Sequence, residues 1–386
     1  MCTAVISPAL PMMKIEFANI DNAAVLLRTC ATMPNIFIAI FSPIFGIIFS
    51  KLEKRRLFLA FFFIIYTISG SSVYFLENIN QIIFARAILG ISISAIMTCG
   101  LDLISRYFNG YERSKVLASQ TLVMSIGSIF FTILSGYLAD FGWRYAFLLY
   151  LTGIVMLVLT WIFIKDDVSN YNSKEANARD DANLDSGKFA KMFGQGLPMV
   201  ICLIGFLNMV FFYMIPIQIP FLLKQINPDI NGKMISYIIT FEVVTSSFFA
   251  LKYKRIKKNH SFESIFVLAF AIMSISHIGI GYSAKYWHIM LFSGIYGIGM
   301  AFIMSNNIVW LVNSVKSGTR GFWIGIMTSA IYLGKFVSPI LLYPLVEVVG
   351  LSKSYVFAGV SMIFIAAFVL FITDGFKVAR RKRISV

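Results

Sequence analysis

The sequence predicts an all-α membrane protein built from two six-helix halves. Of its 386 residues, 58% are hydrophobic and only 13% are charged, which is more apolar surface than a soluble domain of this size can bury. The apolar residues fall into runs of about 20, the length that crosses a bilayer. The basic spacing of Lys51, Lys54 and Arg55 returns at residues 254–258, again between two apolar runs. A repeated basic loop indicates a duplicated helical unit.

Apolar runs of sufficient length predict twelve helices. In chain order they cover residues 1–17, 25–49, 57–76, 81–104, 115–139, 143–164, 195–223, 234–251, 262–282, 286–314, 321–346 and 352–374. The first is short, since only about a dozen residues precede Lys14, too few for about 30 Å of hydrocarbon at about 1.5 Å per residue. We therefore expect this chain to begin inside its first helix, which is truncated at its N-terminus.

Cations gather in the loops that follow even-numbered helices. These loops contain residues 51–56, Arg106 with Arg113 and Lys115, residues 252–258, and Lys316 with Arg320. Loops rich in lysine and arginine stay in the cytoplasm. We therefore expect an integral protein of the cell (inner or plasma) membrane with both termini cytoplasmic.

One polar segment divides the chain. Residues 165–192 are rich in Asn, Asp and Ser and mixed in charge, so they cannot bury themselves and are expected to form a cytoplasmic linker. The expected domains are an N-terminal half at 1–164, this linker, a C-terminal half at 193–376 and a basic cytoplasmic tail at 377–386.

The charge pattern and the missing motifs exclude several functions. The net charge of +15 sits in short clusters between apolar runs, which argues against nucleic-acid binding. The sequence contains no metalloprotease, serine-hydrolase or phosphate-loop motif and no closely spaced cysteines. We therefore expect no enzyme activity, no metal and no cofactor. The expected partners are the bilayer, a small-molecule solute and protons, and the chain is expected to act as a monomer.

The loop after the second helix carries the first family resemblance. The major facilitator superfamily has Gly-x-x-x-Asp-Arg-x-Gly-Arg-Lys/Arg here, and this chain places Gly46, Ser50, Lys51, Glu53, Lys54 and Arg55 at the corresponding positions. The basic positions match, whereas Ser50 replaces the acid and Glu53 replaces the second glycine. Asp102 resembles the acid that pairs with this loop and closes the cytoplasmic gate. Its expected partners are Lys51 and Lys54, with Arg55 next.

Further motifs extend the resemblance over the whole chain. Arg86 and Gly90 match Arg-x-x-x-Gly of the fourth helix, and Gly142–Arg144 matches the Gly-Trp-Arg that opens the sixth. The family assigns such an arginine to proton transfer or substrate contact; a snorkelling arginine at the interface is the alternative. The exporter motif of the fifth helix is only half present, because Phe131 and Thr132 stand where Gly-Pro is expected. The chain is most similar to the drug and metabolite:proton exporter branch.

Two charged residues lie deep within predicted spans of the second half. Glu242 is about nine residues from the outer end of its helix and Lys335 about eleven, so they lie at similar depth and are able to pair. An ionisable group at this depth costs about 2.5–3.5 kcal/mol and generally has a function. We expect the pair to couple protons or to contact substrate; a structural ion pair is the alternative.

The resemblance also implies which helices line the central cavity, namely the first, fourth, seventh and tenth. Asn208 and Tyr213 on the seventh and Asn306 on the tenth are therefore expected substrate contacts, with interhelical hydrogen bonding as the alternative. His277 on the ninth helix is expected to be a packing residue.

These observations predict a secondary active transporter that moves a small organic solute by alternating access. The expected mode is proton-coupled efflux of drugs or metabolites. Proton-coupled nutrient uptake is the alternative within transport, favoured by the incomplete fifth-helix motif. A non-transporting substrate sensor on a transporter fold is the alternative from another class.

Overall fold

The described part of the chain is almost entirely helical. The computed structural model describes residues 2–52, 54–108, 110–164, 196–315 and 319–384, and no β-strand occurs within these ranges. The chain divides into two compact units, one of Met1–Ala190 with Asn231–Lys233 and the other of Lys191–Ile230 with Met234–Val386. The expected linker at 165–192 lies outside the described residues. An all-α membrane fold is thus present as predicted.

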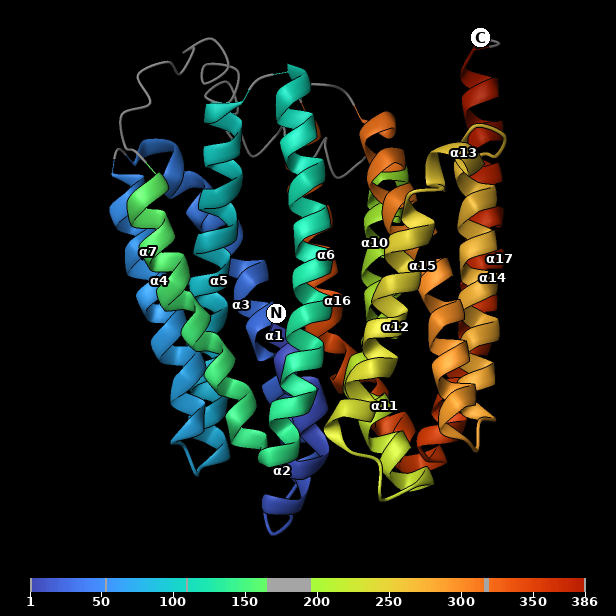
Figure 1. Ribbon diagram of the computed structural model, residues 1–386. Coiled ribbons are helices and arrows are strands. Elements are labelled where there is room, and N and C mark those ends of the chain that lie inside the picture. The colour runs from blue at the N-terminus through green and yellow to red at the C-terminus, as the bar shows by residue number, and fades with distance from the viewer. Residues whose placement is uncertain (1, 53, 109, 165–195, 316–318, 385–386) are drawn as a thin grey trace. The chain divides into compact units, whose positions relative to one another are not determined.

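The first unit holds the helices from α1 to α7 (Figure 1). They are α1 (Cys2–Ile6), the 3-10 helix η1 (Ser7–Ala9), α2 (Leu10–Glu16), α3 (Ala23–Lys51), α4 (Arg55–Ser71), η2 (Ser72–Tyr74), α5 (Ile79–Tyr107), α6 (Gly110–Phe141), η3 (Trp143–Leu151) and α7 (Thr152–Phe163). The single helix expected at 1–17 is wrong in detail, because three short segments replace it. Pro8 and Pro11 stand at the starts of the second and third segments, where a residue without an N–H interrupts the helical ladder.

The second unit holds the helices from α10 to α17. They are α10 (Gly196–Phe212), α11 (Met214–Ile226), α12 (Gly232–Ala250), α13 (Tyr253–Lys257), α14 (Phe262–Gly281), α15 (Tyr286–Ser314), α16 (Arg320–Val349) and α17 (Leu351–Ile384). The helix expected at 195–223 is divided at Tyr213, since Pro216 has no N–H to offer the carbonyl of Phe212. The residues expected as a tail continue α17 as far as Ile384.

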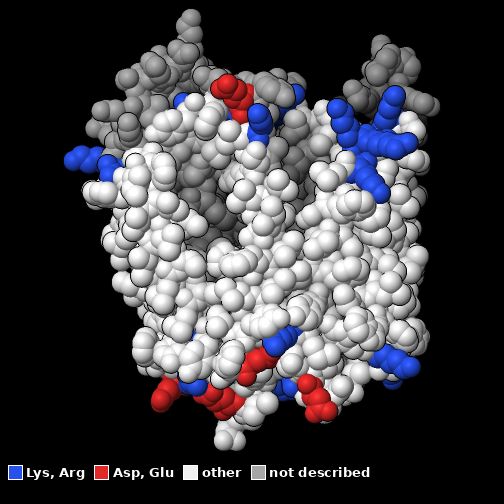
Figure 2. All heavy atoms as spheres, in the orientation of Figure 1, with Lys and Arg blue, Asp and Glu red and all other residues white. Residues whose placement is uncertain are grey.

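Ten helical segments in the described ranges are long and apolar enough to cross a membrane. The interrupted segment at the N-terminus and α12, which carries Lys233 and Glu242, are not among them. On the face in Figure 2 the charged side chains gather toward the ends of the helices, and the surface between them is uncharged. This distribution is typical of helices surrounded by hydrocarbon.

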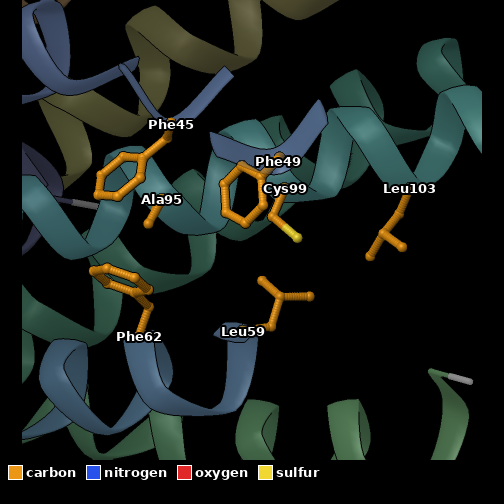
Figure 3. Close-up of a cluster of buried hydrophobic side chains, with 7 residues drawn as sticks. All are labelled: Phe45, Phe49, Leu59, Phe62, Ala95, Cys99 and Leu103. Carbon is orange, nitrogen blue, oxygen red and sulfur yellow. The ribbon is translucent and has the colours of Figure 1, made fainter. Parts of the chain in front are cut away.

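A phenylalanine-rich core fixes the helices that carry the basic loop. Its buried members come from α3, α4 and α5 (Figure 3): Phe45, Phe49, Leu59, Phe62, Ala95, Cys99 and Leu103. The rings of Phe45 and Phe62 meet edge to face at 5.2 Å between centroids, a favourable geometry for aromatic pairs. This packing holds the end of α3 and the start of α4 against α5, which places the basic loop beside Asp102.

Candidate functional site

Asp102 on α5 joins two arginines at the expected gate. Its Oδ2 accepts hydrogen bonds from Nε of Arg55 at 3.0 Å and from Nε of Arg106 at 2.8 Å. Arg55 also donates through Nη2 to the carbonyl of Phe49 at 3.0 Å, so one side chain ties α4 to both α3 and α5. The carboxylate is only 10% exposed, which strengthens these charge-assisted bonds relative to a surface pair.

Of the partners expected for Asp102, the structure shows Arg55 bonded to it. Arg55 was expected behind Lys51 and Lys54, and Arg106 was not expected at all. Lys54 is exposed at the start of α4, and the side chains of Ser50 and Lys51 lie outside the described residues. Gly46 makes no close approach, since a Cβ there would lie 4.0 Å from Thr98. Arg106 follows Asp102 by one helical turn, a spacing that the sequence displays.

Arg86 is completely buried and donates to a carbonyl that α3 leaves without a helical hydrogen bond at Pro34. Pro34 lies inside α3, so the carbonyl of Cys30, four residues earlier, has no helical N–H to accept. Arg86 on α5 supplies the donor instead, with Nε 3.2 Å from that carbonyl. Its Nη1 donates to the hydroxyl of Tyr150 at 2.7 Å. Arg86 is therefore no snorkelling residue; it joins α3, α5 and η3.

Gly90 explains the rest of that motif. A Cβ on Gly90 would lie 2.6 Å from the carbonyl oxygen of Pro34 and 2.9 Å from Cβ of Phe37. Only a residue without a side chain lets α5 approach α3 so closely. Arg86 and Gly90 are one turn apart on the same face, so the motif packs α5 against α3 where Pro34 interrupts the hydrogen bonding of α3.

In the second unit, the amide of Asn208 on α10 faces a row of residues on α15. Its Nδ2 lies 3.5 Å from Sδ of Met300 and 4.0 Å from Sδ of Met304, both weak acceptors. Its Oδ1 is buried without a hydrogen-bond partner. A buried amide left this incomplete costs free energy, which makes Asn208 a candidate for a ligand contact.

The two neighbouring asparagines of α15 have opposite environments. Asn306 accepts from the hydroxyl of Tyr253 at 3.1 Å and donates to the carbonyl of Phe262 at 2.9 Å. Asn307 is 1% exposed, and neither its nitrogen nor its oxygen has a hydrogen-bond partner. The amide of Asn306, expected to contact substrate, is used in joining α13 and α14 to α15. Asn307, one position later, has the open hydrogen-bonding capacity.

Asn307 belongs to the same face of α15 as Met300 and Met304, at a spacing of four and three residues. A Cβ on Gly205 of α10 would lie 3.7 Å from its Nδ2, so Asn307 also faces α10. Together, Asn208, Met300, Met304 and Asn307 define what we call the amide face. The sequence spacing of residues 300, 304 and 307 predicts that they share one face of a helix, but nothing in the sequence distinguished Asn307 from Asn306 as the residue with unpaired polar atoms.

Glu242 and Lys335 do not form the ion pair allowed by their depth, as none joins them in the described part of the chain. The ammonium of Lys335 on α16 lies over aromatic rings, 4.5 Å from the ring centroid of Tyr332 and 5.7 Å from that of Tyr213. Cation–π contacts of this kind stabilise a partly dehydrated cation. Lys335 and Tyr213, both expected in the site, are thus brought together, while Glu242 lies elsewhere.

Glu242 is 3% exposed on α12, against the face of α15. Its carbonyl would lie 2.4 Å from a Cβ on Gly297, so the helices touch there. The preceding residue, Tyr296, has a buried hydroxyl without a hydrogen-bond partner.

The imidazole of His277 on α14 packs against the ring of Tyr296, with 4.8 Å between ring centroids. The imidazole is fully buried, and neither ring nitrogen makes a hydrogen bond of ordinary geometry, although the backbones of Phe211 and Met273 lie near. Tyr296 and His277 thus form a buried polar pair. Their described surroundings contain no metal-binding set of three acidic, histidine or cysteine side chains.

Comparison with known proteins identifies the family. The profile of the Major Facilitator Superfamily matches residues 1–250 and 201–384, so the chain belongs to that superfamily. The crystal structure of a D-xylose-proton symporter superposes with a TM-score of 0.77 over 95% of this chain and 93% of its own, at 17% identity. The xylose transporter XylE from E. coli, partially occluded and inward open, gives 0.72 over 96% and 93%, at 15% identity.

A curated relative matches a smaller part. The riboflavin transporter RibZ of Clostridioides difficile (strain 630) is 26% identical over 132 residues, which are 34% of this chain and 29% of that protein. The matched segment therefore spans under a third of the relative's length. Membership of this superfamily makes the chain an integral membrane protein of a transporter family, not of an enzyme family.

Proposed function

We propose that the chain is a proton-coupled exporter of small drug-like or metabolite solutes, and that Glu242 carries the proton. The observation behind this proposal is the carboxyl group of Glu242, which is 3% exposed on α12 and has no lysine or arginine joined to it among the described residues. A carboxyl group that takes up a proton loses its charge, and this changes the free energy of facing protein or water. Protonation at this position can therefore bias an alternating-access equilibrium.

The amide face suggests the class of solute. Asn208 and Asn307 offer neutral hydrogen-bonding groups, and Met300 and Met304 offer flexible, polarizable contact area. Lys335, Tyr332 and Tyr213 add ring surfaces and a cation. Such a set suits a flat amphipathic compound with several neutral polar groups. Riboflavin, the cargo named for one relative, has this chemistry, and D-xylose, named for another, lacks the flat ring.

The direct test uses the purified chain in proteoliposomes with a pH-sensitive dye and a panel containing riboflavin, cationic dyes and D-xylose. We expect Glu242→Gln to lose accumulation driven by a pH gradient while it keeps solute exchange without a gradient, because glutamine is permanently neutral. Glu347→Gln is the matched control, since Glu347 is exposed on α16 of the same unit. Gradient-driven accumulation by Glu242→Gln equal to that of the parent would overturn the role of Glu242. A chain that binds solute and never moves it would be a sensor.

Uptake is the second candidate, and the incomplete exporter motif at Phe131 and Thr132 favours it. The same vesicles decide between the two. Solute and protons that cross in opposite directions indicate an exporter, whereas movement in the same direction indicates a symporter. We further propose that the Arg55–Asp102–Arg106 cluster closes the cytoplasmic gate and that both termini are cytoplasmic, which labelling of single introduced cysteines from either side will test.

A further inference from the structure

An apolar groove opens on the first unit between α4 and α7, which pack side by side (Figure 1). Its volume is about 510 Å³, and its lining consists of Leu57, Ala60, Phe61, Ile64, Leu157, Val158, Trp161 and Ile162. Ala60 is 5% exposed and forms the floor, whereas Phe61 and Val158 on the two walls are 56% and 50% exposed. The four lining residues of α4 span about 10 Å along the helix. The groove is thus open and apolar, and it lies on the surface of a membrane-spanning unit.

A fixed cation stands at one end of this groove. The guanidinium of Arg56 lies over the ring of Trp161, with 4.1 Å from Cζ to the centroid. Arg56 also donates to the carbonyl of Trp161. These contacts hold the planar guanidinium in place, and a fixed guanidinium is well suited to bind a phosphate. Exposed Lys54 adds positive charge at the same end, where α4 begins.

We propose that this groove binds an anionic phospholipid, with one acyl chain along α4 and α7 and the phosphate at Arg56. The apolar lining matches the chain, and the cationic end matches the headgroup. The basic loop before α4 is expected on the cytoplasmic side, so the lipid belongs to the cytoplasmic leaflet, whose surface is rich in anionic lipid. This ligand is separate from any transported solute.

A second groove on the same unit gives an internal comparison. It has about 600 Å³ and lies between α4 and α5, lined by apolar residues with Ser69, Ser72, Asn80 and Gln81. Neither groove has a lysine or arginine in its lining, but in the described residues no cation lies over the one ring that lines this second groove, Phe84, as Arg56 lies over Trp161 in the first. We expect the second groove to accept acyl chains without regard to headgroup charge.

The test is lipid binding to the purified full chain, measured by native mass spectrometry and by the shift in thermal unfolding temperature. Phosphatidylglycerol is compared with phosphatidylcholine of the same chains. We expect the parent to prefer the anionic lipid roughly tenfold and Arg56→Gln to lose most of that preference. Lys252→Gln is the matched control, because Lys252 also lies over aromatic rings, those of Phe248 and Phe249 at 4.5 and 5.0 Å, but neither ring lines a groove, whereas Arg56 lies over Trp161 of the lining.

Two further arms separate the groove from the headgroup alone. Val158→Trp fills the groove from its exposed wall. We therefore expect this variant to bind phosphatidylglycerol more weakly while it stays folded. Inorganic phosphate at equal concentration should leave the unfolding temperature unchanged. Equal preference in Arg56→Gln and the parent, an equal loss in Lys252→Gln, or a full stabilising effect of phosphate alone would each overturn the proposal.

Discussion

Buried polar groups are used differently in the two units. In the first unit, Arg86 donates to a carbonyl that Pro34 leaves without a helical partner, and Arg55 and Arg106 bind Asp102. In the second unit, Asn208, Asn307, Tyr296 and His277 are buried with polar atoms that lack a hydrogen-bond partner. Among the described residues, most such atoms lie in the second unit.

We infer from this difference that the buried polar groups of the first unit stabilise the fold, whereas those of the second unit serve solute binding and proton coupling. A satisfied buried group stabilises the structure that satisfies it, while an unsatisfied one costs free energy that a solute or a proton can recover. We therefore expect substitutions of the satisfied groups to act on stability, and substitutions of the unsatisfied groups to act on transport. The following experiments test that distinction.

The largest effect is expected for Arg86→Met. The change leaves the Cys30 carbonyl and the Tyr150 hydroxyl without their donor, at about 1–3 kcal/mol for each buried group, so we expect unfolding in detergent to become easier by about 2–5 kcal/mol. Lys335→Met is the comparison, since the Lys335 ammonium lies over an aromatic ring. This change should lower the free energy of unfolding by less than Arg86→Met does. Equal destabilisation by the two changes would contradict the inference that the two units use their buried polar groups differently.

Asn306→Ala and Asn307→Ala form an adjacent pair with opposite expectations. Asn306→Ala removes hydrogen bonds to Tyr253 and Phe262 and should lower the free energy of unfolding by about 1–3 kcal/mol without changing the KM of the folded protein. Asn307→Ala should leave stability nearly unchanged and raise KM roughly tenfold. Thermal unfolding and vesicle flux measure the two quantities, and the reverse pattern would refute the amide face.

Asp102→Asn should have a moderate effect in the first unit. It removes the charge that Arg55 and Arg106 share, and we expect a loss of about 1–2 kcal/mol. High salt should lower the free energy of unfolding of the parent toward that of the variant, since screening weakens a partly exposed ion pair. A variant that matches the parent in stability at low salt would show that this cluster contributes no stability to the unit.

The smallest effect is expected at Glu16, outside the ten candidate spans. Partial burial opposes its ionisation, but hydrogen bonds from Arg144 and Trp143 outweigh this, so the pKa of Glu16 falls below its usual 4.5. A lowered folded-state pKa gives stability that is complete above pH 4.5 and is lost as the pH falls through the folded value.

Glu16→Gln should therefore unfold at a slightly lower temperature than the parent at pH 7, with the gap closing below about pH 4.5. Thermal scans across pH measure this gap. The carboxylate is 39% exposed, so the effect is small, and a gap that is constant with pH would contradict it.

The sequence by itself determined the membrane class, the positions of most helices and the superfamily. Runs of apolar residues and loop charge depend on hydrocarbon thickness and local composition, and both are readable along the chain. It also placed Asp102, Arg86 and Glu242 among the residues to examine. The interruption of the first and seventh helices was missed, although Pro8, Pro11 and Pro216 were visible.

Only the tertiary structure decided which of these residues meet. Depth along two helices allowed Glu242 to reach Lys335, but depth says nothing of which way each side chain points around its helix, and Lys335 lies over Tyr332 instead. The same is true of Asn306 and Asn307: neighbours on a helix point about 100° apart. Asn306 therefore accepts a hydrogen bond from Tyr253, while Asn307 faces α10. Pairing depends on the rotation and packing of helices, which the linear spacing does not contain.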